Sequence, residues 1–198
     1  MKAGSDLRAD HRVIRRLEYA IRKMSARIAR GEKLPPEDVE EAIGLMMEFV
    51  DAYHHAKEEV GLFPVVQGVA RGEQKTVYGF LVEHEFGRRA AMRIEQEYVR
   101  WAKGEETAES LSRFMLTYAD FIRAHTSKED AWFEAVDGRL LSAEQQREVL
   151  GRFSRVEKNP QAKKEFARRV NRLAVRYSGR RGKGDAIGGS HRPTEGLP

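Results

Sequence analysis

The chain has 198 residues, of which 40% are hydrophobic and 34% are charged, and its formal net charge is +5. This size and apolar content suit one packed domain with a short appendage. Cysteine is absent, which excludes disulfide bonds, thiolate catalysis and metal sites built on cysteine. We find no signal region and no apolar run of membrane length, so we expect a soluble, cytoplasmic protein without a membrane partner.

Four long segments carry apolar residues at spacings of three, four and seven, the pattern of an amphipathic α-helix. Glycine and proline separate these segments. The predicted helices cover residues 6–29, 36–68, 74–102 and 106–136. No alternating run or hairpin sequence indicates a strand. We therefore predict an all-α protein in which residues 1–138 form an up-down-up-down antiparallel four-helix bundle.

The rest of the chain is predicted to be an appendage to this bundle. Two shorter helices, at residues 142–157 and 161–177, make up a C-terminal helical extension over residues 139–177. Residues 178–198 are glycine-rich and lack an apolar period, so we expect a disordered basic tail. Residues 161–183 contain nine Lys or Arg and one Glu. We favour an amphipathic helix lying on the bundle over a segment that docks on nucleic acid or another anionic partner.

Each long segment places one histidine on its apolar stripe, namely His11, His54, His84 and His125. Counted from the connecting turns, His11 lies level with His54, and His84 lies level with His125. Glu58 and Glu129 follow the second and fourth of these histidines by four residues, on the same helix face. Facing His and Glu side chains in a bundle core can build a two-metal centre. We predict that these six residues meet there; the alternative is a purely structural bundle without metal.

The same periodicity separates these residues from their neighbours in the sequence. His55 and Glu59 continue the row of Glu48 and Asp51, which reads as a solvated face. We therefore expect His55 to lie outside the metal ligands, at the surface or just behind them.

These motifs resemble the hemerythrin-like, or HHE cation-binding, family over residues 6–136. The matching stretches are Asp10-His11, His54-His55-Ala56-Lys57-Glu58-Glu59, Glu83-His84-Glu85 and His125 to Asp130. The resemblance implies two iron ions in a non-heme di-iron centre with an oxo or hydroxo bridge. It implies the ligands His11, His54, Glu58, His84, His125 and Glu129.

The implied function is binding of, or reaction with, oxygen, peroxide or nitric oxide, for sensing, detoxification or storage. The alternative is a metal-stabilised binding module that uses the basic C-terminal segment. The sequence assigns no catalytic residue. The sequence does not indicate the oligomeric state, and it does not indicate whether a substrate is turned over.

One departure from the oxygen-carrying hemerythrins bears on this function. Those proteins place a second ligand histidine one turn after the histidine of the third helix, where this chain has Arg88. The six residues then supply four protein donors to each iron, and both irons keep an open position. This favours sensing or small-molecule redox chemistry over reversible oxygen carriage.

Overall fold

The computed structural model describes residues 2–157, 159 and 161–178. Every regular element in this part of the chain is helical, and no described helix has the length and apolar character that a membrane span needs. The elements are α1 (Ala3–Ala29), α2 (Pro36–Leu45), η1 (Met46–His55), η2 (Lys57–Leu62), α3 (Phe63–Val69), η3 (Arg71–Glu73), α4 (Gln74–Ala102), α5 (Ala108–Ala135), η4 (Val136–Leu140), α6 (Ala143–Val156) and α7 (Ala162–Arg176). Apart from Ser178, the predicted tail lies outside the described residues.

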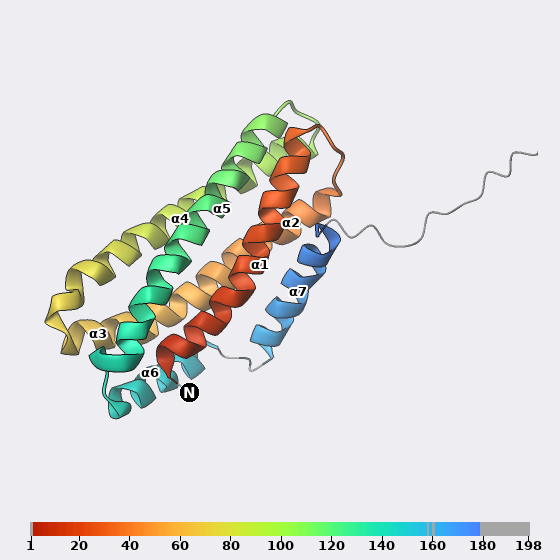
Figure 1. Cartoon of the computed structure of the whole chain (residues 1–198). Coiled ribbons are helices and arrows are strands. Elements are labelled where there is room, and N and C mark those ends of the chain that lie inside the picture. The colour runs from red at the N-terminus through yellow and green to blue at the C-terminus, as the bar shows by residue number, and fades with distance from the viewer. Residues whose placement is uncertain (1, 158, 160, 179–198) are drawn as a thin grey trace, which may run out of the picture.

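Four long helical segments form an antiparallel bundle: α1, the run from α2 to α3, α4 and α5 (Figure 1). Short connections reverse the chain after α1 and after α4. Gly31 and Gly104 lie in these connections with φ values of 72° and 85°. Glycine adopts this left-handed conformation without strain, which makes it a common residue just past a helix end. The predicted all-α four-helix bundle is confirmed.

The second segment was predicted as an ordinary amphipathic α-helix, and its middle is different. Met46–His55 and Lys57–Leu62 are π-helical, so their backbone hydrogen bonds join residues five apart instead of four. Each turn therefore contains more residues than an α-helical turn. This changes which side chains of the second segment face the core.

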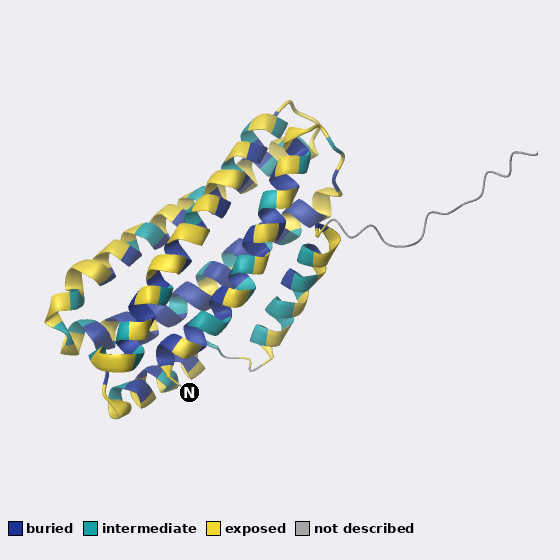
Figure 2. Ribbon diagram, viewed as in Figure 1, coloured by how far each residue is buried: buried dark blue, intermediate teal, exposed yellow. Residues whose placement is uncertain are grey.

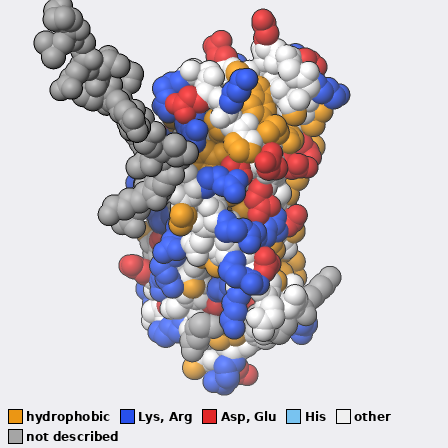
Figure 3. Space-filling view, turned by 90° about the vertical axis from the view of Figure 1, so that its right-hand side faces the viewer, with side chains coloured by type: hydrophobic (Ala, Val, Ile, Leu, Met, Phe, Trp, Pro, Cys, Tyr) orange, Lys and Arg blue, Asp and Glu red, His pale blue; other side chains and the backbone are white. Residues whose placement is uncertain are grey.

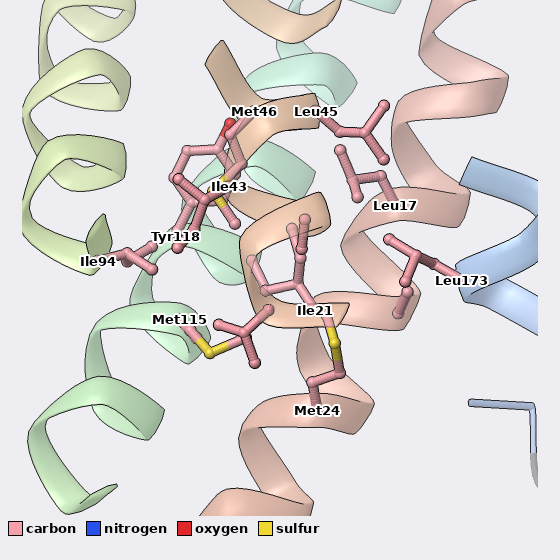
Figure 4. Close-up of a cluster of buried hydrophobic side chains, with 14 of the residues drawn as sticks. Leu17, Ile21, Met24, Ile43, Leu45, Met46, Ile94, Met115, Tyr118 and Leu173 are labelled. Carbon is pink, nitrogen blue, oxygen red and sulfur yellow. The ribbon is translucent and has the colours of Figure 1, made fainter. Parts of the chain in front are cut away.

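Two apolar clusters fill the bundle, one toward each end, and their residues form the inward faces of the helices (Figure 2). The larger cluster includes Ile21, Met24, Met46, Ile94 and Met115 (Figure 4). The smaller cluster includes Leu7, Leu62, Phe63, Phe80 and Phe133. In each long segment, one histidine lies between the residues that pack in the larger cluster and those that pack in the smaller one. The four histidines of the predicted site thus form a polar layer between two apolar ones.

The C-terminal helices pack on this bundle. α6 starts with a capping box, in which Ser142 and Gln145 satisfy each other's backbone N–H groups, and it places Phe153 in the smaller cluster. α7 lies along α1 and α2, and it buries Val170 and Leu173 in the larger cluster. The bundle core therefore extends beyond the four long segments.

The basic side chains of α7 lie beside acidic residues of the bundle. Figure 3 shows the side of the molecule that carries α7, with Lys and Arg interspersed among Asp and Glu. Three α7 cations pair with bundle carboxylates: Lys163 with Asp6 and Asp10, Arg169 with Glu41 and Glu48, and Arg176 with Asp38. α7 thus has the form that the sequence favoured, an amphipathic helix lying on the bundle.

We predict that truncating the buried face of α7 destabilises the whole domain. Leu173→Ala should lower the free energy of unfolding by about 2–5 kcal/mol, because it leaves a cavity against α1. Val175 is 71% exposed, so Val175→Ala is the matched control and should change it by less than about 0.5 kcal/mol. Urea unfolding of the full chain measures both. Equal stability of the Leu173 variant and the control would show that α7 is not part of the core.

Candidate metal centre

The structure brings the six predicted residues together in the middle of the bundle. They come from all four long segments, and each is at most 1% exposed: His11, His54, Glu58, His84, His125 and Glu129. Apolar side chains above and below this layer exclude water from it. The helices therefore bring two carboxylates and four imidazoles together in a dry interior.

Each carboxylate lies between imidazoles of different helices. Glu58 places Oε1 3.4 Å from His54 Nε2 and Oε2 3.3 Å from His84 Nε2. Glu129 places Oε2 3.3 Å from His11 Nε2 and 3.1 Å from His125 Nε2. Every histidine thus turns Nε2 toward the two glutamates, which have the geometry of bridging groups.

Several of these buried atoms have no hydrogen-bond partner in the described part of the chain. They are both oxygens of Glu58, Oε2 of Glu129 and Nε2 of His125. A buried carboxylate without a partner is costly, and a cation is its natural counterpart. Imidazole and carboxylate donors suit iron, manganese or zinc. Nitrogen and oxygen donors of His11, His54, Glu58 and Glu129 lie within 4.8 Å of one another, so the donor set fits a metal ion.

A second set of carboxylates faces the outer nitrogen of each imidazole. The Nδ1-to-oxygen distances are 2.7 Å for His11–Asp130, 2.7 Å for His84–Glu59, 2.8 Å for His125–Glu83 and 3.6 Å for His54–Asp10. Each outer carboxylate is next in sequence to a site residue of its own helix, and it reaches the histidine of a neighbouring helix. In His11, His84 and His125, where the distance is that of a hydrogen bond, such a partner holds Nδ1 protonated and leaves Nε2 available to a metal ion, whereas His54 Nδ1 has no hydrogen-bond partner among the described residues.

A cation lies behind each outer carboxylate. The pairs are Arg15–Asp130, Arg88–Glu59, Lys128–Glu83, Lys57–Asp10 and Lys163–Asp10. These cations offset the outer negative charge and fix the carboxylates in place. Sequence reasoning missed this outer layer, because its members look like ordinary surface residues of amphipathic helices. Their position directly beside a site residue was the available signal.

A family comparison agrees with this geometry. The model of the hemerythrin HHE cation-binding domain matches residues 3–136, which span α1 to the first residue of η4. The chain belongs to this family. Neither the curated proteins nor the solved structures contain a significant match. The chain is therefore a metal-binding helical protein of the hemerythrin HHE family.

Arg88 lies one turn after His84 on α4. Its guanidinium lies 2.8 Å from Asp51 and 2.6 Å from Glu59. Glu59 was predicted to face solvent, and this was wrong: its side chain is only 25% exposed and contacts His84. Arg88 therefore acts on the centre through Glu59, by fixing the partner of an imidazole.

Lys57 is the most deeply buried lysine or arginine in the described part of the chain. Its side chain is 0% exposed, and Nζ contacts Asp6, Asp10 at 2.9 Å and Glu157 at 3.2 Å. Burial alone would raise the pKa of Asp10, but His54 and the two lysines beside it lower this pKa well below its usual range. The C-terminal helices thereby supply charges to the partner of His54.

The position of His55 differs from the prediction. We expected it at or near the surface, but it is 2% exposed, and its ring stacks on that of His84 with centroids 3.8 Å apart. In the π-helical segment consecutive residues turn through a smaller angle, so His54 and His55 both face inward.

The sequence did carry a signal for this wider turn. Val50, His54, Glu58 and Leu62 recur at intervals of four residues, and no interval of three compensates. On a straight α-helix three such steps would rotate the buried stripe by about 120°. A wider turn keeps all four residues on one side, as the buried pairs at 49–50, 53–54, 57–58 and 61–62 show.

The metal-free site holds protons in place of a cation. Burial alone would lower the pKa of His11, but Asp130 and Glu129 raise it to about 9. Burial likewise opposes charge on His84, but Glu129, Glu58 and Glu59 raise its pKa to about 11. Burial opposes charge on Glu129 too, yet the surrounding histidines lower its pKa well below the ordinary value. Metal binding must therefore displace protons from the imidazoles.

We predict that the metal-free protein becomes less stable between pH 7 and pH 9.5. A histidine with a raised folded-state pKa stabilises the fold below the unfolded-state pKa, and this stabilisation is lost as the pH rises through the folded-state value. His11, with a pKa of about 9, should alone account for a loss on the order of 2 kcal/mol, because one pKa unit corresponds to about 1.4 kcal/mol, and His84, with a pKa of about 11, adds to this loss and continues it above pH 9.5. Chemical unfolding at both pH values measures it. The metal-loaded protein is the control, and an equal loss there would argue against protons on His11 and His84 as the cause.

Proposed function

We propose that this chain is a non-heme di-iron protein that binds or reacts with oxygen, peroxide or nitric oxide. The observation that carries this proposal is the placement of Glu58 and Glu129. Each lies in a dry core between the Nε2 atoms of two histidines from different helices. Two carboxylates in this arrangement suit a pair of ions that share them.

The four histidines divide into two pairs around the glutamates. The Nε2 atoms of His11 and His54 lie 3.0 Å apart, and the rings of His84 and His125 lie 5.0 Å apart by centroid. We assign one iron to each pair, with both glutamates shared, which gives each iron four protein donors. Iron would supply redox chemistry and an open position for a small molecule.

The protein supplies the setting for this chemistry. The outer carboxylates hold the Nδ1 protons of His11, His84 and His125, and the two apolar clusters keep bulk water out. We further propose that residues 1–138 are the metal-binding domain and that residues 139–177 support it through Lys163 and Glu157. Sensing, detoxification and storage of a small molecule are all compatible with such a site.

The alternative function, docking of the basic C-terminal segment on an anionic partner, has less support. Arg169 and Arg176 pair with bundle carboxylates, and the apolar face of α7 is buried. A nucleic acid would have to compete with these contacts.

We predict about two irons per chain in the purified, iron-loaded protein. Glu58→Ala and Glu129→Ala should each halve or abolish iron binding, because each variant removes a donor from both ions. Glu97 is 2% exposed but bonds with Ser110 and Arg93, away from the centre, so Glu97→Ala is the matched control for loss of a buried glutamate. Iron and protein are measured on the same sample. Full iron content in both site variants would end the di-iron assignment.

We predict that oxygen oxidises the reduced protein. With four protein donors on each iron, the centre would keep a position open to oxygen on each ion and would supply two electrons to it. The measurement is the optical spectrum of the reduced protein after mixing with oxygen and after purging with argon. Recovery of the reduced spectrum over repeated cycles would instead indicate reversible carriage.

A further inference from the structure

A cavity of about 310 Å³ lies between η1 and α4, against the His84 side of the centre. Its walls are mostly apolar and include Met46, Met47, Ala91, Met92 and Tyr118. Met46 and Tyr118 also belong to the larger apolar cluster (Figure 4). Asp51 and Arg88 line it too, and they pair with each other.

His55 is the lining residue that connects the cavity to the centre. Its ring stacks on His84 and meets the ring of His125 edge-on, with centroids 5.6 Å apart. Neither ring nitrogen of this buried side chain has a hydrogen-bond partner among the described residues; Nδ1 is 3.4 Å from Asp51 without bonding geometry. A buried imidazole with both nitrogens unpaired needs an explanation.

Ring nitrogens of His55, His84 and His125 lie within 4.8 Å of one another, but the stacking geometry argues against His55 as a further metal ligand. Its ring plane is inclined by only 10° to that of His84. An imidazole lone pair lies in the plane of its ring, so the lone pairs of two parallel stacked rings cannot converge on one ion. His55 therefore lies beside the His84–His125 position, with nitrogens that remain available to another molecule.

We propose that this cavity is the passage by which a small ligand reaches the His84–His125 position, and that His55 hydrogen-bonds the ligand there. This inference rests on the proposed di-iron function and adds its access route and a specificity-determining residue.

The cavity also limits the class of ligand. Its volume is at the low end for small-molecule sites, and its walls offer thioether, methyl and aromatic surface. Arg88 forms ion pairs with Asp51 and Glu59. The lining residues therefore offer no unpaired cation that could bind a large anion. The lining therefore suits a ligand that is neutral or singly charged and accepts or donates one hydrogen bond, and the cavity is wide enough to admit diatomic and triatomic molecules.

Azide is a suitable probe, because it has three atoms and gives an optical band when it binds iron. We compare the iron-loaded full chain with His55→Phe, which keeps an aromatic ring without hydrogen-bonding groups, and His55→Gln, which restores them. Both variants should keep two irons. His55→Phe should weaken azide binding about tenfold, the effect of one lost hydrogen bond, while His55→Gln should retain most of the affinity. If His55→Phe does not fold, His55→Leu replaces it.

The passage is tested separately by placing a larger side chain in the cavity. Met47 is half-buried at the cavity, and Met47→Trp should slow azide association severalfold at unchanged iron content. The matched control is Val82→Trp, at a surface hollow of α4 lined by Tyr78, Val82 and Phe86 and distinct from this cavity. It should leave the rate unchanged.

Each outcome bears on one part of the proposal. Loss of iron in His55→Phe would make His55 a ligand and overturn its assignment as a ligand-contacting residue. Unchanged azide affinity in that variant would contradict the proposed hydrogen bond from His55. An unchanged rate of azide association in Met47→Trp would contradict the proposed passage. Absence of iron from the wild-type protein would instead contradict the proposed di-iron function itself.

Discussion

The rest of the structure depends on two carboxylates that lie in an apolar bundle core. Glu58 and Glu129 are fully buried, and water cannot solvate them there. Four imidazoles surround them, one from each long segment of the bundle. In the metal-free protein these groups share protons, and in the proposed loaded protein two cations replace most of those protons. Either way, the polar layer requires all four segments to meet at the same height.

The outer layer of charges orients the imidazoles. Each histidine has a carboxylate facing Nδ1, at hydrogen-bond distance in His11, His84 and His125, and each carboxylate has a cation behind it. These pairs run around the bundle from helix to helix, so a shift of one helix disturbs the partner on the next. Through Lys163 and Glu157, the chain beyond the bundle takes part in this layer, on the side of His54.

The two halves of the centre differ in their surroundings. Beside His11 lies Phe133 of the smaller apolar cluster, whose ring is 5.5 Å away by centroid. Beside His84 lie His55 and a cavity between η1 and α4. The two halves of the centre thus carry the same kinds of inner side chain, and the cavity lies on the His84 side.

The sequence by itself determined the helical bundle and the set of residues that meet in it. Apolar spacing fixes which face of a helix is buried, and a His or Glu on that face has to find partners in the core. What the tertiary structure decided is how the neighbours of those residues are used. Asp10, Glu59, Glu83 and Asp130 look solvated on their own helices, and only the packing of the next helix turns them into partners of imidazoles. The inward position of His55 likewise depends on the π-helical turn, because a helix of ordinary pitch would have carried that side chain away from the centre.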